Sequence, residues 1–241
     1  MTMDISDLIR FYKTPLGQIV RDELASFIQQ NNAIKGYHLY IGFPFYCIAN
    51  DQDTNIYLMD RTIGAIHYPS AQHNKVALFD LNAIPLADTS VHKITLCHSL
   101  EFAPNPTRFM RELWRILSPE GSIRIIVPNR RSIWSHLDTS PFGQGNPYSM
   151  GQLSALAKQC QFDIISKQRG LFTLPHQSWQ PTFITQTQRS LMKNIAPKLS
   201  GVIVMDLIKR VYCRTLPKER KRLTASESII RAKVSSFDDR G

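Results

Sequence analysis

The sequence predicts an α/β protein with a seven-stranded, mostly parallel sheet and helices on both of its faces. Seven short runs of apolar and aromatic residues have the length of strands. They alternate with segments whose apolar residues recur at helical spacing. The runs are almost continuously apolar, which is typical of strands that helices cover on both faces. At 241 residues, the chain is long enough for one large domain with its own core.

The first half of the chain predicts two helices and four strands. A helix is expected over residues 15–30, because Thr14 is a suitable cap and Pro15 suits the first turn. The second helix is expected to begin after Asn105 and to end before the Pro/Gly turn at residues 118–121. The four expected strands are residues 37–41, 55–59, 75–80 and 93–97.

The second half predicts three more strands and one helix. The helix is expected over residues 149–160, where Ser149 and Gln152 form a capping box. The strands are expected at residues 122–127, 162–167 and 201–205. Residues 171–200 hold three prolines and a Gln/Thr-rich stretch, and they are expected to form an irregular or helical insertion. We expect a domain over residues 1–212 and a basic, mobile tail over residues 213–241.

The charge of the chain excludes little by itself. Lys and Arg exceed Asp and Glu by 29 to 19, a net charge of +10. The tail from residue 213 holds eight basic and four acidic residues, or +4, so the excess is spread over the chain. The tail lacks the interleaved aromatic residues of RNA-binding modules. A solubilising tail is expected, with weak polyanion binding as the alternative.

Other protein classes are disfavoured by what the chain lacks. No apolar run approaches the ~18 residues of a membrane span, and the first residues carry acids where a signal peptide is basic. The four cysteines are widely separated, with no CxxC pair, so neither a metal site nor a disulfide framework is expected. A cytoplasmic protein is therefore expected. A nicotinamide dehydrogenase is disfavoured because no GxGxxG motif follows the first strand.

Residues 80–130 resemble a known family. At the end of the third strand the chain has the acid Asp80, followed by Leu-Asn-Ala-Ile-Pro-Leu-Ala-Asp-Thr-Ser, and its central helix ends in Arg-Ile-Leu-Ser-Pro-Glu-Gly. This window is similar to the type 11 group of class I S-adenosylmethionine-dependent methyltransferases. The resemblance implies a Rossmann-like fold, methyl transfer and S-adenosylmethionine as the cofactor. It also implies that Asp80 accepts a hydrogen bond from the adenine amino group and that Leu81 lies beside the adenine ring.

The first half of the domain departs from the family pattern. The first turn has the single glycine Gly42 among bulky residues, where the family usually has two or three glycines. The ribose-binding acid aligns with Met59, so Asp60, one position later, is the expected substitute. Segments such as residues 127–131 and 146–149 resemble a divergent bacterial, mostly alphaproteobacterial, methyltransferase-like subfamily with an equally altered turn.

Candidate catalytic residues lie after the fourth and fifth strands. His98 follows the fourth strand, where a histidine is able to take a proton from the methyl acceptor. Glu101 is expected either to orient His98 or to cap the next helix. Arg130 and Tyr148 are expected at the rim where the acceptor enters. The alternative to an enzyme is a non-catalytic binding or assembly module that has kept the fold but lost the cofactor, and the altered first turn favours it.

Overall fold

The structure is a computed structural model, and it describes residues 4–29, 36–48, 51–173, 175 and 199–210. The strands are β1 (His38–Gly42), β2 (Asn55–Asp60), β3 (Val76–Phe79), β4 (Val91–Cys97), β5 (Leu117–Pro128), β6 (Asp163–Gly170) and β7 (Val202–Ile208). The helices are α1 (Ile5–Lys13), α2 (Pro15–Ile28), α3 (Pro106–Ile116) and α4 (Met150–Gln159).

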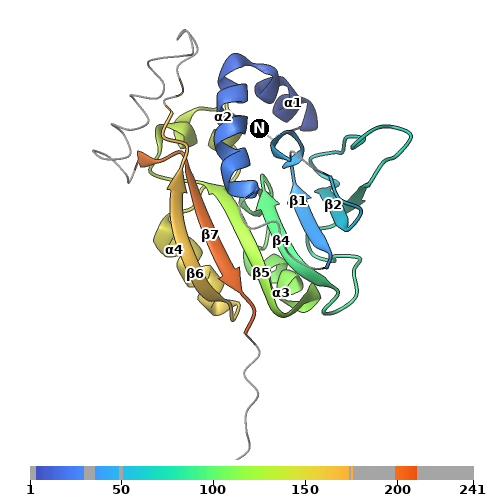
Figure 1. Cartoon of the computed structure of the whole chain (residues 1–241). Helices are drawn as coiled ribbons and strands as arrows, with labels where there is room; N and C mark the ends of the chain where they lie inside the picture. The colour runs from blue at the N-terminus through green and yellow to red at the C-terminus, as the bar shows by residue number, and fades with distance from the viewer. Residues whose placement is uncertain (1–3, 30–35, 49–50, 174, 176–198, 211–241) are drawn as a thin grey trace, which may run out of the picture. The chain divides into compact units, whose positions relative to one another are not determined.

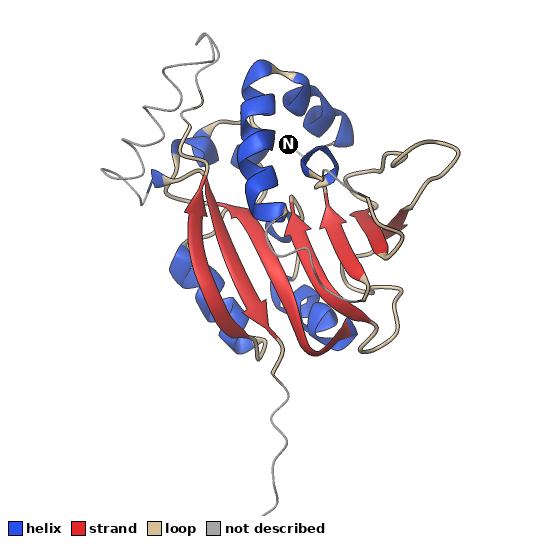
Figure 2. Cartoon of the chain, viewed as in Figure 1, coloured by secondary structure: helices blue, strands red, loops and turns tan. Residues whose placement is uncertain are grey.

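The strands form one sheet in the order β3-β2-β1-β4-β5-β7-β6 (Figure 1). The first five strands pair in parallel, and β7 is antiparallel to both β5 and β6. Helices lie on both faces of the sheet (Figure 2). This arrangement confirms the predicted seven-stranded, mostly parallel α/β fold.

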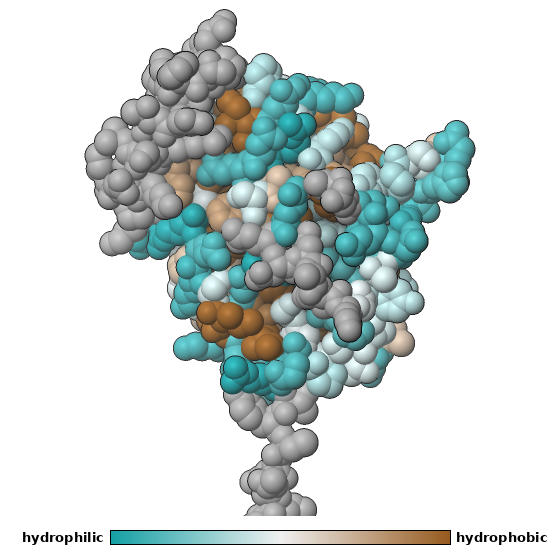
Figure 3. Space-filling model, in the orientation of Figure 1, coloured by the Kyte–Doolittle hydropathy of each residue, from teal (hydrophilic) through white to brown (hydrophobic). Residues whose placement is uncertain are grey.

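Two apolar clusters fill the space between the sheet and its helices. The cluster on the α3 and α4 face includes Phe109, Leu113 and Leu153. The cluster on the opposite face includes Val20 and Leu24 of α2. Figure 3 shows apolar patches between hydrophilic ones on one side of the surface. The apolar faces of the helices therefore pack on a sheet that is buried on both sides, as the continuous apolar runs predicted.

The amino-terminal helices differ from the predicted single helix. The predicted helix 15–30 corresponds to α2, and α1 precedes it as an additional helix. A capping box closes the start of α1, in which the Asp4 carboxylate accepts from Ser6 N–H and the Asp7 carboxylate accepts from Asp4 N–H. The two helices meet at Gly17, where a Cβ atom would lie 2.0 Å from the carbonyl oxygen of Phe11. This close corner folds α1 back toward the carboxyl ends of the strands.

The turn predicted at residues 118–121 also differs from the structure. The helix α3 ends at Ile116 as expected, but the strand β5 begins at Leu117 and runs through these residues. Glu120 takes a positive φ of 60°, and its N–H donates to the carbonyl oxygen of Lys209. The pairing with the chain after β7 thus extends the strand across the predicted turn. Most of the predicted insertion 171–200 lies outside the described residues, and so does the whole of the predicted tail 213–241.

His38 lies buried at the start of β1 and is expected to make the fold sensitive to acid. Burial, with the charges of Lys93 and Arg124, lowers the pKa of His38 from 6.5 to about 3. The unfolded chain therefore takes up this proton first, and stability is complete above pH ~6.5 and falls as the pH drops toward 3. Urea unfolding at pH 7, 5 and 4 is expected to show a loss of about 3 kcal/mol between pH 7 and pH 4.

The variant His38→Gln removes this titration and is expected to flatten the acid limb of the stability profile. The matched control is His73→Gln, because His73 is exposed. A His38→Gln profile that falls as steeply as that of the unchanged chain would show that other groups cause the acid sensitivity.

Candidate functional site

The carboxyl ends of the parallel strands bring the predicted site residues to one edge of the sheet. Gly42 ends β1 and pairs with Cys97 at the end of β4, while Asp60 ends β2 and pairs with Phe79 of β3. Strand order reverses between β1 and β4, since β2 and β3 lie on one side and β5 on the other. In open α/β sheets, ligands bind in the crevice at such a switch point. The edge formed by these turns is therefore the candidate site.

Gly42 is the point of closest approach between the two central strands. Its φ is +97°, and a Cβ atom there would lie 2.0 Å from the carbonyl oxygen of Cys97. The following residue, Phe43, donates its N–H to the same oxygen at 2.7 Å. Phe43 and Phe45 are buried against α1 and α2. The altered first turn is therefore a packed corner with one obligatory glycine.

Asp60 and Met59 point to opposite faces at the end of β2. Met59 is 1% exposed and belongs to the apolar cluster under α2. Asp60 accepts hydrogen bonds from the N–H of Thr62 at 3.1 Å and from its hydroxyl at 2.7 Å. The carboxylate at the end of β2 is therefore that of Asp60, and its hydrogen bonds to Thr62 hold it in a local turn.

Asp80 presents a partly exposed carboxylate at the end of β3. One oxygen accepts from the Asn82 N–H at 2.8 Å, and the other accepts from the Arg61 guanidinium at 2.9 Å. The hydrogen bond from the Asn82 backbone is the main reason that the pKa of Asp80 is lowered. Leu81 is buried beside it. The edge therefore holds an ionised acceptor next to an apolar side chain.

His98 is buried just after β4, in contact with α1. Its φ is +54°, an uncommon conformation outside glycine that often marks functional sites. The Tyr12 hydroxyl lies 2.7 Å from His98 Nε2. Burial, with the neighbouring Cys97, Cys47 and Glu101, raises the pKa of Tyr12 well above its usual range, so its phenol stays protonated. On the other side of the ring, His98 Nδ1 lies 3.4 Å from Glu101 Oε1, and neither atom has a hydrogen-bond partner among the described residues.

Glu101 faces His98. The alternative prediction, that Glu101 caps the next helix, is wrong. Its Oε2 accepts from the Ser99 N–H at 3.1 Å, while α3 is capped by Asn105. Tyr12 is the residue of this group that the sequence analysis did not identify. The Asp4 and Asp7 capping pattern was the available signal, because it marks the start of the helix that carries Tyr12.

Arg130 and Tyr148 lie together after β5. Arg130 N–H donates to the Tyr148 carbonyl oxygen at 2.9 Å, and Tyr148 N–H donates to the Pro128 carbonyl oxygen at 3.0 Å. Arg130 is exposed, and burial raises the pKa of Tyr148 to about 12. A protonated phenol and a guanidinium are thus available beside the strand that neighbours β4.

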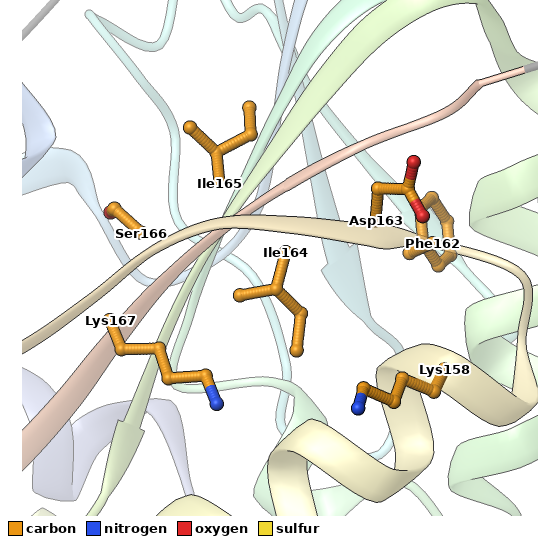
Figure 4. A pocket seen from close by; sticks show the side chains of 7 residues that line it. All are labelled: Lys158, Phe162, Asp163, Ile164, Ile165, Ser166 and Lys167. Atoms are coloured by element: carbon orange, nitrogen blue, oxygen red, sulfur yellow. The ribbon is translucent and has the colours of Figure 1, made fainter.

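A separate pocket opens between α4 and the edge strand β6 (Figure 4). Lys158 and Lys167 extend into it on either side of Ile164. No residue that the sequence analysis assigned to the cofactor or the acceptor lines this pocket. In the described part of the chain, no helix is long and apolar enough to cross a membrane.

The segment that matches a known protein family contains the strand ends of the candidate site. Residues 42–125, from the first turn to the fifth strand, match the family model described as a methyltransferase domain. No curated protein matches the chain. The family match spans Gly42, Asp60, Asp80, Leu81 and His98.

Solved structures share the fold at low sequence identity. An S-adenosylmethionine-dependent methyltransferase from Thermotoga maritima has a TM-score of 0.58 at 14% identity, over 86% of this chain and 96% of that one. A complex of the Trm112 methyltransferase activator with a methyltransferase from Haloferax volcanii has a TM-score of 0.57 at 13% identity, covering 82% and 93%. A methyltransferase of the same cofactor dependence from Aquifex aeolicus has a TM-score of 0.53 at 13% identity, covering 86% and 98%.

The family match and the fold agree with each other. The match covers the segment in which the first five strands and α3 build the candidate site. The chain has the class I methyltransferase fold, and its residues 42–125 match the methyltransferase-domain family model.

Proposed function

We propose that this chain transfers a methyl group from S-adenosylmethionine to an acceptor, either a small molecule or a macromolecule. The observation that carries the proposal is the shared edge of the sheet. Gly42, Asp60, Asp80 and His98 come from four different strand ends and lie at the same edge, inside or next to the switch point. This is where an open α/β sheet binds its ligand.

The residues at this edge fit the cofactor. Asp80 keeps a partly exposed, ionised carboxylate for the adenine amino group, and Leu81 offers an apolar surface for the ring. Asp60 would hold the ribose hydroxyls if its bonds to Thr62 rearrange. Gly42 leaves no side chain between β1 and β4. When bound, the cofactor supplies an activated methyl group on its sulfonium.

His98 is the proposed base for an acceptor that loses a proton. The Tyr12 hydroxyl is hydrogen-bonded to Nε2, and Nδ1, which faces Glu101 without a hydrogen bond, is the nitrogen proposed to take the proton. The hydrogen bond with Tyr12 orients the ring. Arg130 and Tyr148 are proposed to contact the acceptor at the rim.

The altered first turn is the one feature that favours a non-catalytic module, and the family match does not favour that alternative. The match spans the turn itself together with the acid after β3. We infer that the divergent turn belongs to the alphaproteobacterial methyltransferase-like subfamily that the sequence resembles.

Replacing Asp80 with alanine is expected to weaken cofactor binding about 10- to 100-fold, because a hydrogen bond to an ionised acceptor contributes ~1.5–3 kcal/mol. Isothermal titration with S-adenosylmethionine and S-adenosylhomocysteine measures this. The control is Asp88→Ala. Asp88 is an exposed carboxylate in the loop before β4, and it forms an ion pair with Arg115. Absence of heat with either ligand for the unchanged chain refutes the proposed function, and equal affinity of Asp80→Ala refutes the assigned role of Asp80.

A further inference from the structure

Unsatisfied buried polar atoms gather at the turn after β4. In the described part of the chain, four buried side-chain polar atoms lack a hydrogen-bond partner. Three of them lie within four consecutive residues: His98 Nδ1, Ser99 Oγ and Glu101 Oε1. Their residues are 2%, 2% and 0% exposed. Buried polar groups are almost always paired, so a cluster of unpaired ones indicates a missing occupant.

The Glu101 carboxylate in this cluster indicates which kind of ligand would bind there. Among the described residues, the basic group within ion-pair distance of Glu101 is His98, and no lysine or arginine pairs with it. A buried carboxylate without a hydrogen bond to one oxygen is costly. Glu101 Oε1 and the Ser99 hydroxyl are both able to accept hydrogen bonds from a donor. The turn therefore favours a cation or a group with several N–H donors.

Aromatic rings form the surroundings of the same turn. The His98 ring lies 5.9 Å from the Tyr12 ring and 5.1 Å from the Phe142 ring, measured between centroids. Phe43 stacks on Tyr12 at 5.8 Å. Aromatic faces attract organic cations, and the attraction grows when water is excluded. The carboxylate and the rings thus point to an organic cation as the occupant.

We propose that Glu101 and Ser99 hold a positively charged group of the cofactor at the turn after β4. This inference rests on the proposed function. The cofactor carries two such groups, the ammonium of its methionyl end and the sulfonium. The first turn offers little room for either, because Phe43 and Phe45 are packed against the amino-terminal helices. Glu101, which follows the end of the neighbouring strand β4, binds the positively charged group in place of the first turn.

Three nucleoside probes that differ in charge test the proposal. 5′-Methylthioadenosine has neither cation, S-adenosylhomocysteine has the ammonium, and S-adenosylmethionine has both. Affinities are measured by calorimetry, with competition against S-adenosylhomocysteine for weak binding. Glu101→Gln keeps the shape of the side chain and removes its charge. It is expected to weaken S-adenosylmethionine about 10- to 100-fold and to leave 5′-methylthioadenosine within about twofold, the range for losing a charge-assisted hydrogen bond.

The response of S-adenosylhomocysteine identifies the group that Glu101 holds. An equal loss for this probe assigns the ammonium, and no loss assigns the sulfonium. Equal affinity of all three probes for Glu101→Gln and the unchanged chain overturns the proposal and leaves the turn to ordered water. An equal loss for all three probes also overturns it, because the variant then damages the site as a whole.

A second variant keeps the test valid if Glu101→Gln does not fold. Ser99→Ala removes a single buried hydroxyl and is expected to weaken S-adenosylmethionine about threefold, with 5′-methylthioadenosine unchanged. The matched control is Glu120→Gln, an exposed carboxylate at the far end of the sheet, which is expected to change no affinity. If the unchanged chain binds none of the probes, the proposed function fails. If it binds them but Glu101 and Ser99 have no effect, only this inference fails.

Discussion

Replacing Gly42 with alanine is expected to destabilise the protein by about 3–5 kcal/mol, because strain and overpacking each contribute ~1–3 kcal/mol. The new Cβ atom would lie 2.0 Å from the Cys97 carbonyl oxygen and 2.7 Å from that of His98. Both contacts are with backbone, at the last residue of the central strand β4 and at the residue after it, and this backbone cannot move aside alone. The φ of +97° adds strain for any side chain.

Urea unfolding of Gly42→Ala measures this loss directly. The matched control is Gly151→Ala in the first turn of α4, where an added Cβ meets nothing within 4 Å. Because alanine is the better helix former, this control is expected to gain up to ~1 kcal/mol. A Gly42→Ala variant as stable as the unchanged chain would mean that β1 and β4 do not approach as closely as described.

Replacing Asp206 with asparagine is expected to cost about 3–5 kcal/mol, the usual loss when one partner of a buried ion pair is removed. The Asp206 oxygens accept from Arg124 Nε at 2.6 Å and Nη2 at 3.0 Å, and from the Ser166 hydroxyl at 2.6 Å. Arg124 also donates to the Phe27 carbonyl oxygen near the end of α2. This network ties β5, β6, β7 and α2 together. The variant removes the Asp206 charge from beside a guanidinium that is 6% exposed.

The pKa of Asp206 supports the same expectation. Burial by itself raises it, but the hydrogen bonds from Arg124 and Ser166 outweigh burial and lower it. The matched control is Asp22→Asn, because the Arg21–Asp22 pair is largely exposed. Exposed pairs contribute ~0.2–1 kcal/mol. Chemical unfolding of both variants compares them, and equal losses would contradict a buried, stabilising network around Arg124.

The sequence predicted the strands and three of the four helices because burial leaves a local pattern. Continuous apolar runs mark strands that are covered on both faces, and Asn105 and Ser149 mark helix starts. The helix α1 was missed because it is short and its capping box uses Asp4 and Asp7. The start of β5 was misplaced because Pro119 and Gly121 suggest a turn, whereas pairing with Lys209, 88 or more residues away, decides the strand.

In the candidate site, too, the residues of a contiguous motif were predicted, whereas contacts between residues far apart in the sequence were not. Asp80 was found because the motif around it is contiguous and follows a strand. The contact between Tyr12 and His98 joins residues 86 positions apart, and no spacing rule predicts it. The unpaired atoms of Ser99 and Glu101 follow from how the turn after β4 packs. Such features depend on tertiary contacts that a single sequence does not display.

A crystal structure of the chain with S-adenosylhomocysteine tests the central claim most directly, because it shows where the nucleoside lies. The account predicts the adenine beside Leu81 with its amino group on the Asp80 carboxylate, and the methionyl end in the crevice between β1 and β4. A nucleoside bound elsewhere, for example in the pocket between α4 and β6, would contradict it. So would crystals grown with a saturating amount of the ligand that hold none at this edge.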